Sequence, residues 1–337
     1  MASRSAAVGL LITLLLLGSC TWPPPDGPVG RCNGVRFEQV RGRAPSYVGS
    51  TLARFPNDSA MCRALWLPTA DRWFVPQGLA LDGDTAWVSG YRWRAALGDR
   101  ACRLVHVSLR TGRLLASTDR LEAAVYGPRL TFCRHGGAIL KDRHGLWVVE
   151  KERLWLVDPD RVGRSDQVRR VWRLEEPVHG SVLLGGSRSV IGVGSWRDGG
   201  PGRMRWFRYR DLLSDGVTAL VADGRRTPAP DEAESVRSAA TVRRVQGIAP
   251  ARGAAAGRGA WSTSSVSSCG MLISPAGARL AFLPGAEGIE FDGRGGLWVV
   301  SETAARSYQS AGRPLVPMLA RFDVAQLKRG RPPGCSW

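Results

Sequence analysis

PQGLALDGDTAWVSGY (76–91) has a counterpart near the other end of the chain, AEGIEFDGRGGLWVVSET (286–303). Each stretch holds a polar residue before glycine, a short apolar run, an Asp-Gly turn, and a tryptophan among small and β-branched residues. Glycine readily takes the positive φ that tight hairpin turns need. Each stretch therefore predicts two antiparallel strands joined by a short turn.

The tryptophan segment recurs along the chain, which indicates a repeat architecture. Four copies keep the tryptophan and a fifth lacks it: 85–89, 145–149, 259–263, 296–300 and 189–193. Further strand-like runs follow, such as 102–112 and 112–118, so each unit predicts a four-stranded blade. We expect an all-β protein with a β-propeller of six blades, with five as the alternative. Residues 47–74 are expected to form most of a further blade, a strand within 34–40 to complete the last one, and 223–243 to form a surface excursion.

A polar residue followed by glycine precedes the first strand of each unit. The five pairs are Gln77-Gly78, His135-Gly136, His179-Gly180, Gln246-Gly247 and Glu287-Gly288. The first strand of a propeller blade lines the central channel, so these side chains are expected to converge on one opening. Two interpretations stay open. The glycines allow close backbone approach and the polar residues line a wet channel, or the five side chains bind a ligand.

The ligand interpretation includes a metal site and catalysis. His135, His179 and Glu287 are the candidate catalytic residues and the candidate ligands of a divalent cation. Imidazole and carboxylate suit zinc, whereas Glu and Gln oxygens suit calcium. No other cofactor is indicated by a motif. Glu150 and Glu302 follow the tryptophan strands at similar places and could reach the channel mouth.

Residues 76–91 and 286–303 resemble the NHL and gluconolactonase-like propellers, a superfamily that includes strictosidine synthase and the paraoxonases. The resemblance implies a metal held at this blade position by a Glu in a Glu-Gly context and by Asn or Asp from other blades. Glu287 matches that Glu. The other four positions depart from the pattern, because they hold Gln77, His135, His179 and Gln246. Histidine-glycine pairs at this position resemble those of the virginiamycin B lyase type.

The start of the chain is typical of a bacterial lipoprotein signal. Arg4 precedes ten mostly apolar residues, Val8 to Leu17, a run too short to span a bilayer. The following Leu-Gly-Ser-Cys resembles a lipobox, which implies that Cys20 is the lipid attachment site. We expect a signal peptide at 1–19, the lipidated cysteine and a Pro-rich spacer at 20–31, and the propeller domain at 32–337. The alternative is an ordinary secretory signal that leaves Cys20 as a thiol.

The number of cysteines agrees with lipidation of Cys20. The chain has seven cysteines, and setting Cys20 aside leaves an even number suited to three disulfides: Cys32, Cys62, Cys102, Cys133, Cys269 and Cys335. Disulfides of this kind are typical of extracytoplasmic proteins. Fifteen pairings are open for six cysteines. A bond between Cys32 and Cys335 is one expectation, since they lie near the two ends of the domain.

The net charge of +18 comes almost entirely from arginines spread along the chain, with three lysines among the 47 basic residues. We therefore expect no nucleic-acid partner, and contact with anionic lipid or wall polymers is open. The leading hypothesis is a monomeric, lipid-anchored, extracytoplasmic propeller that binds a small molecule, a wall component or a protein at its channel mouth. The alternative is a metal-dependent hydrolase or lyase acting on a lactone or ester, so enzymatic activity is an open question.

Overall fold

A computed structural model describes residues 32–94, 99–125, 129–185, 189–224 and 227–335. They belong to one compact unit, Arg31–Trp337. The expected signal peptide, Cys20 and the Pro-rich spacer lie outside the described residues. Within the described part of the chain, no helix has both the length and the apolar character needed to cross a bilayer.

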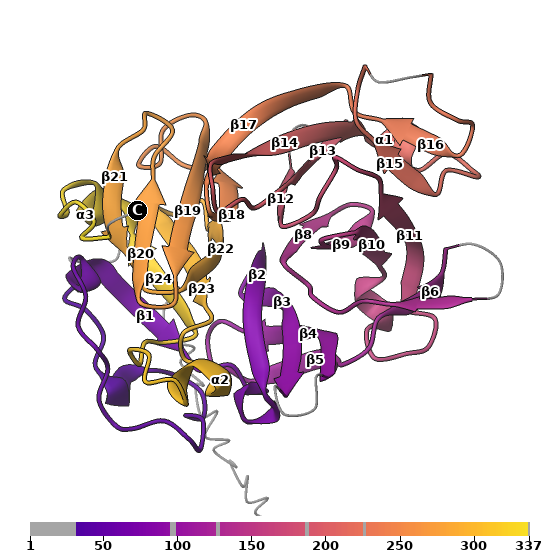
Figure 1. Ribbon diagram of the computed structural model, residues 1–337. Coiled ribbons are helices and arrows are strands. Elements are labelled where there is room, and N and C mark those ends of the chain that lie inside the picture. The colour runs from indigo at the N-terminus through magenta and orange to yellow at the C-terminus, as the bar shows by residue number, and fades with distance from the viewer. Residues whose placement is uncertain (1–31, 95–98, 126–128, 186–188, 225–226, 336–337) are drawn as a thin grey trace, which may run out of the picture. The chain divides into compact units, whose positions relative to one another are not determined.

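The unit is all-β with a β-propeller arrangement (Figure 1). Five of the sheets formed by its described residues contain four consecutive antiparallel strands, and we call these sets of four strands blades 1 to 5. Blade 1 consists of β2 (Phe74–Asp82), β3 (Thr85–Arg94), β4 (Asp99–Ser108) and β5 (Leu114–Thr118). Blade 2 consists of β8 (Ala138–Asp142), β9 (Gly145–Glu150), β10 (Arg153–Val157) and β11 (Val168–Leu174). Blade 3 consists of β12 (Val182–Gly185), β13 (Val190–Gly194), β14 (Pro201–Arg208) and β17 (Arg237–Arg243).

The last two blades follow the same plan. Blade 4 consists of β18 (Val245–Pro250), β19 (Ala260–Val266), β20 (Cys269–Ile273) and β21 (Arg279–Phe282). Blade 5 consists of β22 (Ala286–Phe291), β23 (Gly296–Ser301), β24 (Leu319–Asp323) and β1 (Met61–Leu65). All five tryptophan-type segments of the repeat form the second strand of a blade, as the sequence predicts.

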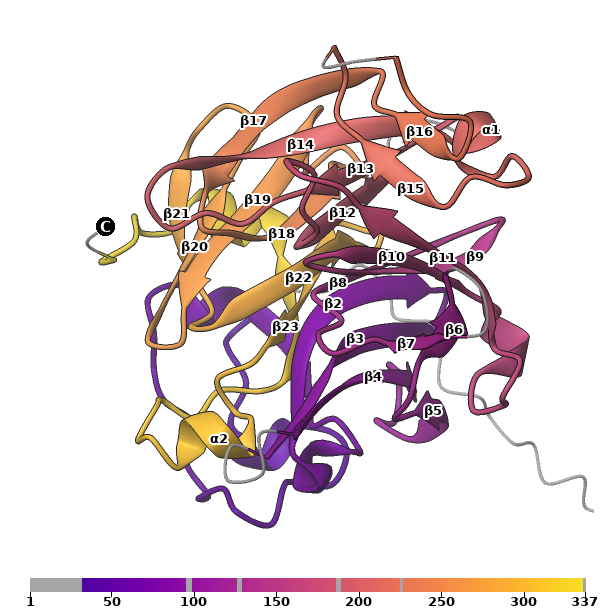
Figure 2. The same cartoon turned by 45° about the vertical axis from the view of Figure 1, so that its right-hand side comes forward.

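The ring closes through its innermost strands. They contact one another in the order β2, β8, β12, β18, β22 and back to β2. In Figures 1 and 2 these strands lie around the centre of the ring of blades. Five blades therefore complete the ring formed by the described residues. The expectation of six blades is corrected to the alternative of five, because residues 47–74 contribute only β1 and the first residue of β2 to the blades and form no sheet of their own.

Strand β1 joins the start of the domain to its end. It pairs antiparallel with β24, with Leu65 opposite Leu319. A strand from the N-terminal region does complete the last blade, but it is Met61–Leu65 and not a strand within 34–40. That earlier segment instead contains the short 3-10 helix η1 (Phe37–Gln39).

The repeated tryptophans fill the spaces between blades. Trp87 packs with Ile139 and Val148 of blade 2, and Trp147 packs with Ile191 and Val193 of blade 3. The rings of Trp147 and Trp172 also stack, with 5.5 Å between their centroids. The motif recurs because each second strand needs one large apolar side chain to fill the interface with the next blade.

Smaller elements decorate the blades. Two strands, β15 (Ala219–Val221) and β16 (Glu232–Glu234), extend the outer edge of blade 2 in parallel, and β6 (Glu122–Ala124) pairs with β7 (Leu130–Phe132). The expected excursion at 223–243 therefore contains two strands, β16 and the outer strand β17 of blade 3. The other helices of the described residues are α1 (Tyr209–Leu212), α2 (Arg306–Gln309), α3 (Val324–Lys328), η2 (Asp58–Ala60), η3 (Ala70–Arg72) and η5 (Pro159–Arg161).

Three disulfides join the six cysteines of the domain, as predicted. They are Cys32–Cys62, Cys102–Cys133 and Cys269–Cys335. The expected Cys32–Cys335 bond is wrong, because Cys32 lies against β1 and Cys335 lies against β20. The two ends of the domain are thus fastened separately, one to blade 5 and one to blade 4.

Candidate functional site

The five polar-glycine pairs lie where the innermost strands begin. Gln77, Gln246 and Glu287 belong to β2, β18 and β22, while His135 and His179 precede β8 and β12. All five therefore stand at the same end of their strands.

The glycines show how tightly these strands approach one another. A Cβ added at Gly288 would lie 2.6 Å from the Leu79 nitrogen, and one at Gly247 would lie 2.3 Å from the Glu287 carbonyl oxygen. A Cβ at Gly78 would lie 2.5 Å from the Ile139 nitrogen. Real Cβ atoms do not come this close to backbone, so the glycines have the structural role of allowing the innermost strands to pack.

Glu287 and Glu302 form the centre of the candidate site. Glu287 is 1% exposed, and its Oε1 has no hydrogen-bond partner among the described residues. Glu302 is also buried, and its Oε2 accepts hydrogen bonds from Gln77 Nε2 and Tyr308 Oη, each at 2.9 Å. Tyr308 reaches this point from α2, which lies between β23 and β24 in the chain.

The two carboxyl groups are hard to ionise together. Burial raises the pKa of Glu287 well above its usual range, and the negative charge of Glu302 raises it further. Burial also raises the pKa of Glu302, although the hydrogen bonds from Tyr308 and Gln77 act in the opposite direction. Like charges in a dry site keep at least one proton at neutral pH unless a cation or ligand compensates them.

Tyr91 and His135 complete the cluster on the side of blade 1. The ring centroids of Tyr91 and His135 are 4.6 Å apart, and Arg100 lies over the Tyr91 ring at 5.6 Å. Burial, with a smaller effect of Arg100, lowers the pKa of His135 to about 4. His135 is therefore neutral at physiological pH, the form in which imidazole accepts a proton or binds a metal. We call this set the acid cluster: Gln77, Tyr91, His135, Glu287, Glu302 and Tyr308.

The remaining two predicted residues lie apart from the acid cluster. His179 Nε2 is 3.0 Å from Oε1 of the exposed Glu176, and its Nδ1 is buried without a hydrogen-bond partner in the described part of the chain. Gln246 is half-buried in β18. Among the described residues, His135, His179 and Glu287 do not bring ligand atoms within reach of one ion. The structure thus groups Gln77, His135 and Glu287 but leaves out His179 and Gln246.

One cluster of metal-ligand atoms does occur, at Cys102, Cys133 and Glu150. The two sulfurs are bonded to each other, so they are not free to bind an ion. Glu150 is buried and accepts hydrogen bonds from the Arg134 backbone nitrogen at 2.9 Å and from Trp155 Nε1 at 3.2 Å. It fixes the segment before β8 and does not join the acid cluster.

Tyr91 and Tyr308 were not predicted as site residues from the sequence. A signal for Tyr91 was present, because Tyr91 follows Trp87 by the same number of residues as Glu302 follows Trp298. Both side chains therefore leave the second strand of their blade at a similar place. Tyr308 carried no such signal, since it lies outside the repeat on α2.

Comparisons with known proteins add little to this geometry. No family model matches the chain, and no curated protein matches it. Similar solved structures include a PQQ-bound aldose sugar dehydrogenase from Streptomyces coelicolor, at 14% identity, with 83% of this chain and 99% of that chain covered and a TM-score of 0.37. They also include a calcium-binding regucalcin from Agrobacterium tumefaciens, at 13% identity, with 80% and 93% covered and a TM-score of 0.41.

A virginiamycin B lyase from Staphylococcus aureus is similar as well, at 12% identity, with 69% of this chain and 79% of that chain covered and a TM-score of 0.31. All three TM-scores are below 0.5. The fold assignment therefore rests on the sheets and their closed ring, and the function must be argued from the acid cluster.

Proposed function

We propose that this protein is a lipid-anchored, extracytoplasmic β-propeller that binds a polar ligand at the end of its channel, against the acid cluster. The observation that carries the proposal is the unpartnered carboxyl oxygen of the buried Glu287. A buried polar atom without a partner costs about 1–3 kcal/mol. A ligand that donates a hydrogen bond to this oxygen, or places a cation beside it, recovers that cost.

The chemistry of the cluster narrows the ligand. Glu287, Glu302 and Gln77 offer oxygen atoms, and His135 offers a neutral imidazole. Oxygen-rich sets of this kind suit calcium, and the imidazole also suits zinc. The ligand is thus expected to be a divalent cation, a cationic group or a molecule rich in hydroxyl groups.

The alternative function is a metal-dependent hydrolase or lyase acting on a lactone or ester. The observation that favours it is the presence of two buried carboxyl groups, Glu287 and Glu302, near Tyr91. The ring of Tyr91 contacts the half-buried and neutral His135. A cation held by Glu287 and Glu302 would polarise a carbonyl oxygen. His135, whose pKa is low, would accept a proton from the attacking group. The superfamily resemblance of 76–91 and 286–303 remains part of this proposal.

Calcium and zinc binding separates these functions. Wild-type protein is expected to bind one of the two ions in equilibrium dialysis, and Glu287→Gln is expected to weaken binding about tenfold, the cost of one charged ligand contact. The exposed Glu38→Gln is the matched control and should bind like wild type. Turnover of a lactone and ester panel by the metal-loaded protein supports the enzyme. Metal binding without turnover supports the binding protein, and equal binding by both variants contradicts the site.

The anchor is tested independently of the channel. Cells grown with labelled palmitate are expected to label wild-type protein and recover it in the membrane fraction. Cys20→Ser should lose the label, because it removes the sulfur to which the lipid is proposed to attach. It should also leave the membrane fraction, because stable anchoring needs the acyl chains. A variant that keeps the label would contradict attachment at Cys20.

A further inference from the structure

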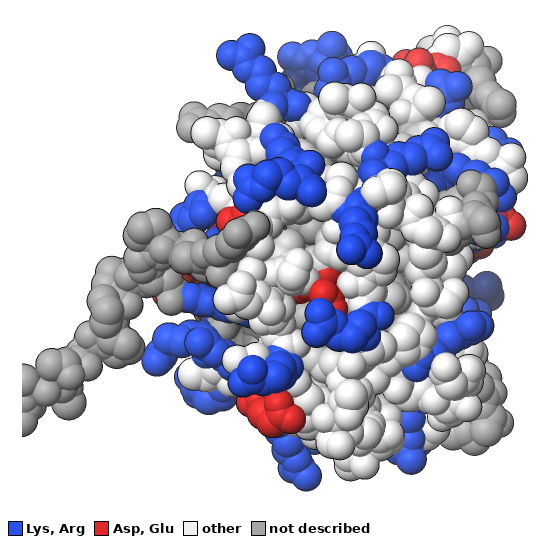
Figure 3. Space-filling view, turned by 90° about the vertical axis from the view of Figure 1, so that its left-hand side faces the viewer, with Lys and Arg blue, Asp and Glu red and all other residues white. Residues whose placement is uncertain are grey.

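A surface rich in basic residues lies where the two ends of the described chain meet. Figure 3 shows the side that carries α3 and β21, where Lys and Arg are spread with few Asp and Glu among them. We call the basic face the set Arg54, Arg279, Lys328, Arg329 and Arg331, all exposed. They come from the segment before η2, from β21, from α3 and from the C-terminal tail.

Backbone and side-chain hydrogen bonds hold these segments together. The Arg331 carbonyl oxygen accepts from the Ala281 backbone nitrogen of β21 at 3.0 Å and from Asn57 Nδ2 at 2.9 Å. The Arg331 backbone nitrogen donates in return to Asn57 Oδ1 at 2.6 Å. These hydrogen bonds hold the tail between β21 and the segment that carries Arg54. The basic side chains of the three segments therefore lie on one surface.

Few acidic groups neutralise this surface. Asp58 pairs with Arg54, and Asp323 is occupied in capping α3, where it accepts from the Gln326 nitrogen at 2.7 Å. Arg279, Lys328, Arg329 and Arg331 form no ion pair with another described residue. The face consequently keeps a net positive charge that is open to solvent.

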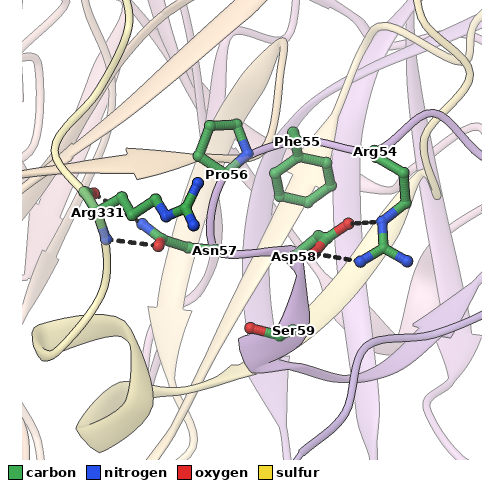
Figure 4. Close-up of a pocket in the computed structure, with 7 residues that line it drawn as sticks. All are labelled: Arg54, Phe55, Pro56, Asn57, Asp58, Ser59 and Arg331. Carbon is green, nitrogen blue, oxygen red and sulfur yellow. Dashed lines mark hydrogen bonds and ion pairs between the residues drawn. The ribbon is translucent and has the colours of Figure 1, made fainter.

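A pocket of about 450 Å³ opens on this face. It is lined by Arg54, Phe55, Pro56, Asn57, Asp58, Ser59 and Arg331. In Figure 4 the Arg331 side chain extends toward Pro56 and Asn57, while Arg54 lies at the other end with Asp58. Arg54 is 85% exposed. A hollow with an arginine at each end suits a small anionic group such as a phosphate.

The place where the chain enters the domain indicates which partner the basic face would meet, namely the membrane that holds the proposed anchor. Cys32 is held against α3, since its backbone nitrogen donates to Gln326 Oε1 at 2.8 Å and its carbonyl oxygen accepts from Gln326 Nε2 at 2.9 Å. The chain thus reaches the domain beside the basic face. Between Cys20 and Cys32 an extended chain spans at most about 40 Å. If Cys20 is lipidated, as the proposed function states, the basic face lies within reach of the bilayer.

We propose that the basic face docks on anionic phospholipid headgroups of the membrane that holds the anchor. The anchor alone leaves the domain free to rotate about its spacer. Docking of the basic face fixes the orientation of the propeller to the bilayer. The headgroup phosphates then lie against Arg329 and Arg331, with one phosphate in the pocket between Arg54 and Arg331.

The test uses the full chain with Cys20→Ser, so that vesicle binding does not depend on the lipid. Co-sedimentation is expected with vesicles that contain phosphatidylglycerol, and not with pure phosphatidylcholine, and binding should fall as salt rises. The triple variant Lys328→Gln, Arg329→Gln, Arg331→Gln should lose about fivefold in partition per residue. These side chains are exposed, and an unchanged unfolding midpoint confirms that the variant folds.

The matched control removes the same charge elsewhere. The control variant carries Arg164→Gln, Arg208→Gln and Arg210→Gln, at exposed residues between β10 and β11, at the end of β14 and in α1. It should bind anionic vesicles like the parent. An equal loss in both triple variants would show a nonspecific effect of net charge and overturn the proposal. Binding to a purified anionic wall polymer without binding to vesicles would also overturn it. Palmitate labelling of wild type reports on the anchor separately. Failure of the lipid attachment at Cys20 can therefore be distinguished from failure of the docking of the basic face.

Discussion

Glu287→Gln is expected to have a larger free energy of unfolding than wild type at neutral pH, and the difference is expected to grow as the pH rises. Wild type buries a carboxyl whose pKa burial raises well above the usual value of 4.5. Between that value and the folded pKa, the folded state holds a proton that the unfolded state has lost. The contribution of Glu287 to the free energy of unfolding is therefore fully present below about pH 4.5. It falls as the pH rises toward the pKa of Glu287 in the folded state.

The slope follows from the linkage of protons to folding. One group contributes up to about 1.4 kcal/mol per pH unit across this window. Glutamine has the shape of the protonated acid and does not titrate, so the variant should lose this part of the decline. Urea unfolding of both proteins at several pH values above 4.5 measures the difference.

The exposed Glu38→Gln is the control, because it removes the same charge at the surface. Its pH profile should run parallel to that of wild type. If Glu287→Gln also runs parallel, Glu287 is not a buried acid with a raised pKa, and the proposed ligand site loses its main support. Saturating calcium or zinc should flatten the wild-type profile if the acid cluster binds the ion, because the cation stabilises the ionised carboxylates.

Gly288→Ala is expected to destabilise the propeller by about 3 kcal/mol, near the upper end of the usual cost of overpacking. The added Cβ would lie 2.6 Å from the Leu79 nitrogen and 2.9 Å from the Gln77 carbonyl oxygen. Both atoms are backbone of β2, so no side-chain rotation relieves the contact. The blades must separate where β22 meets β2, which closes the ring.

Gly199→Ala provides the comparison for this variant, since no atom lies within 4 Å of its added Cβ. It should unfold within about 0.5 kcal/mol of wild type, the usual range for surface changes. Denaturant unfolding of the two variants measures the contrast. Equal stability of the two would mean that β2 and β22 do not approach as closely as described, and the closed ring of five blades would be wrong.

The sequence predicted the repeated part of this fold well. A tryptophan marks the second strand of four blades, and an Asp-Gly turn joins the first two strands of two of them. This local chemistry predicts the second strands and the start of the first ones. The closing strand was placed wrongly because Met61–Leu65 carries no such motif. Its partner β24 lies at the far end of the chain, and no local pattern reports a contact at that separation.

The candidate site was predicted in part, for a related reason. Gln77 and Glu287 belong to the repeat, and the ring brings them to one level. Tyr308 enters the acid cluster from α2, an insertion whose path over the channel end follows from tertiary packing. His179, although predicted, is not part of the acid cluster. It pairs with the exposed Glu176 instead. The disulfide pairing was likewise decided by which cysteines the blades place side by side.

The pairing of β1 with β24 has a consequence for the order in which the protein is made. Among the described residues, β1 is the first strand and β24 the last. A chain that emerges from its N-terminus therefore holds β1 without its partner strand until almost all of the chain has appeared. Blades 1 to 4 can form from neighbouring segments during that time, but blade 5 must wait. A chain cut short before residue 319 would leave blade 5 without its two outer strands and β23 as an exposed edge. Only a chain extended through 319–323 can complete blade 5, so the pairing of β1 with β24 reports that synthesis has reached the last described strand.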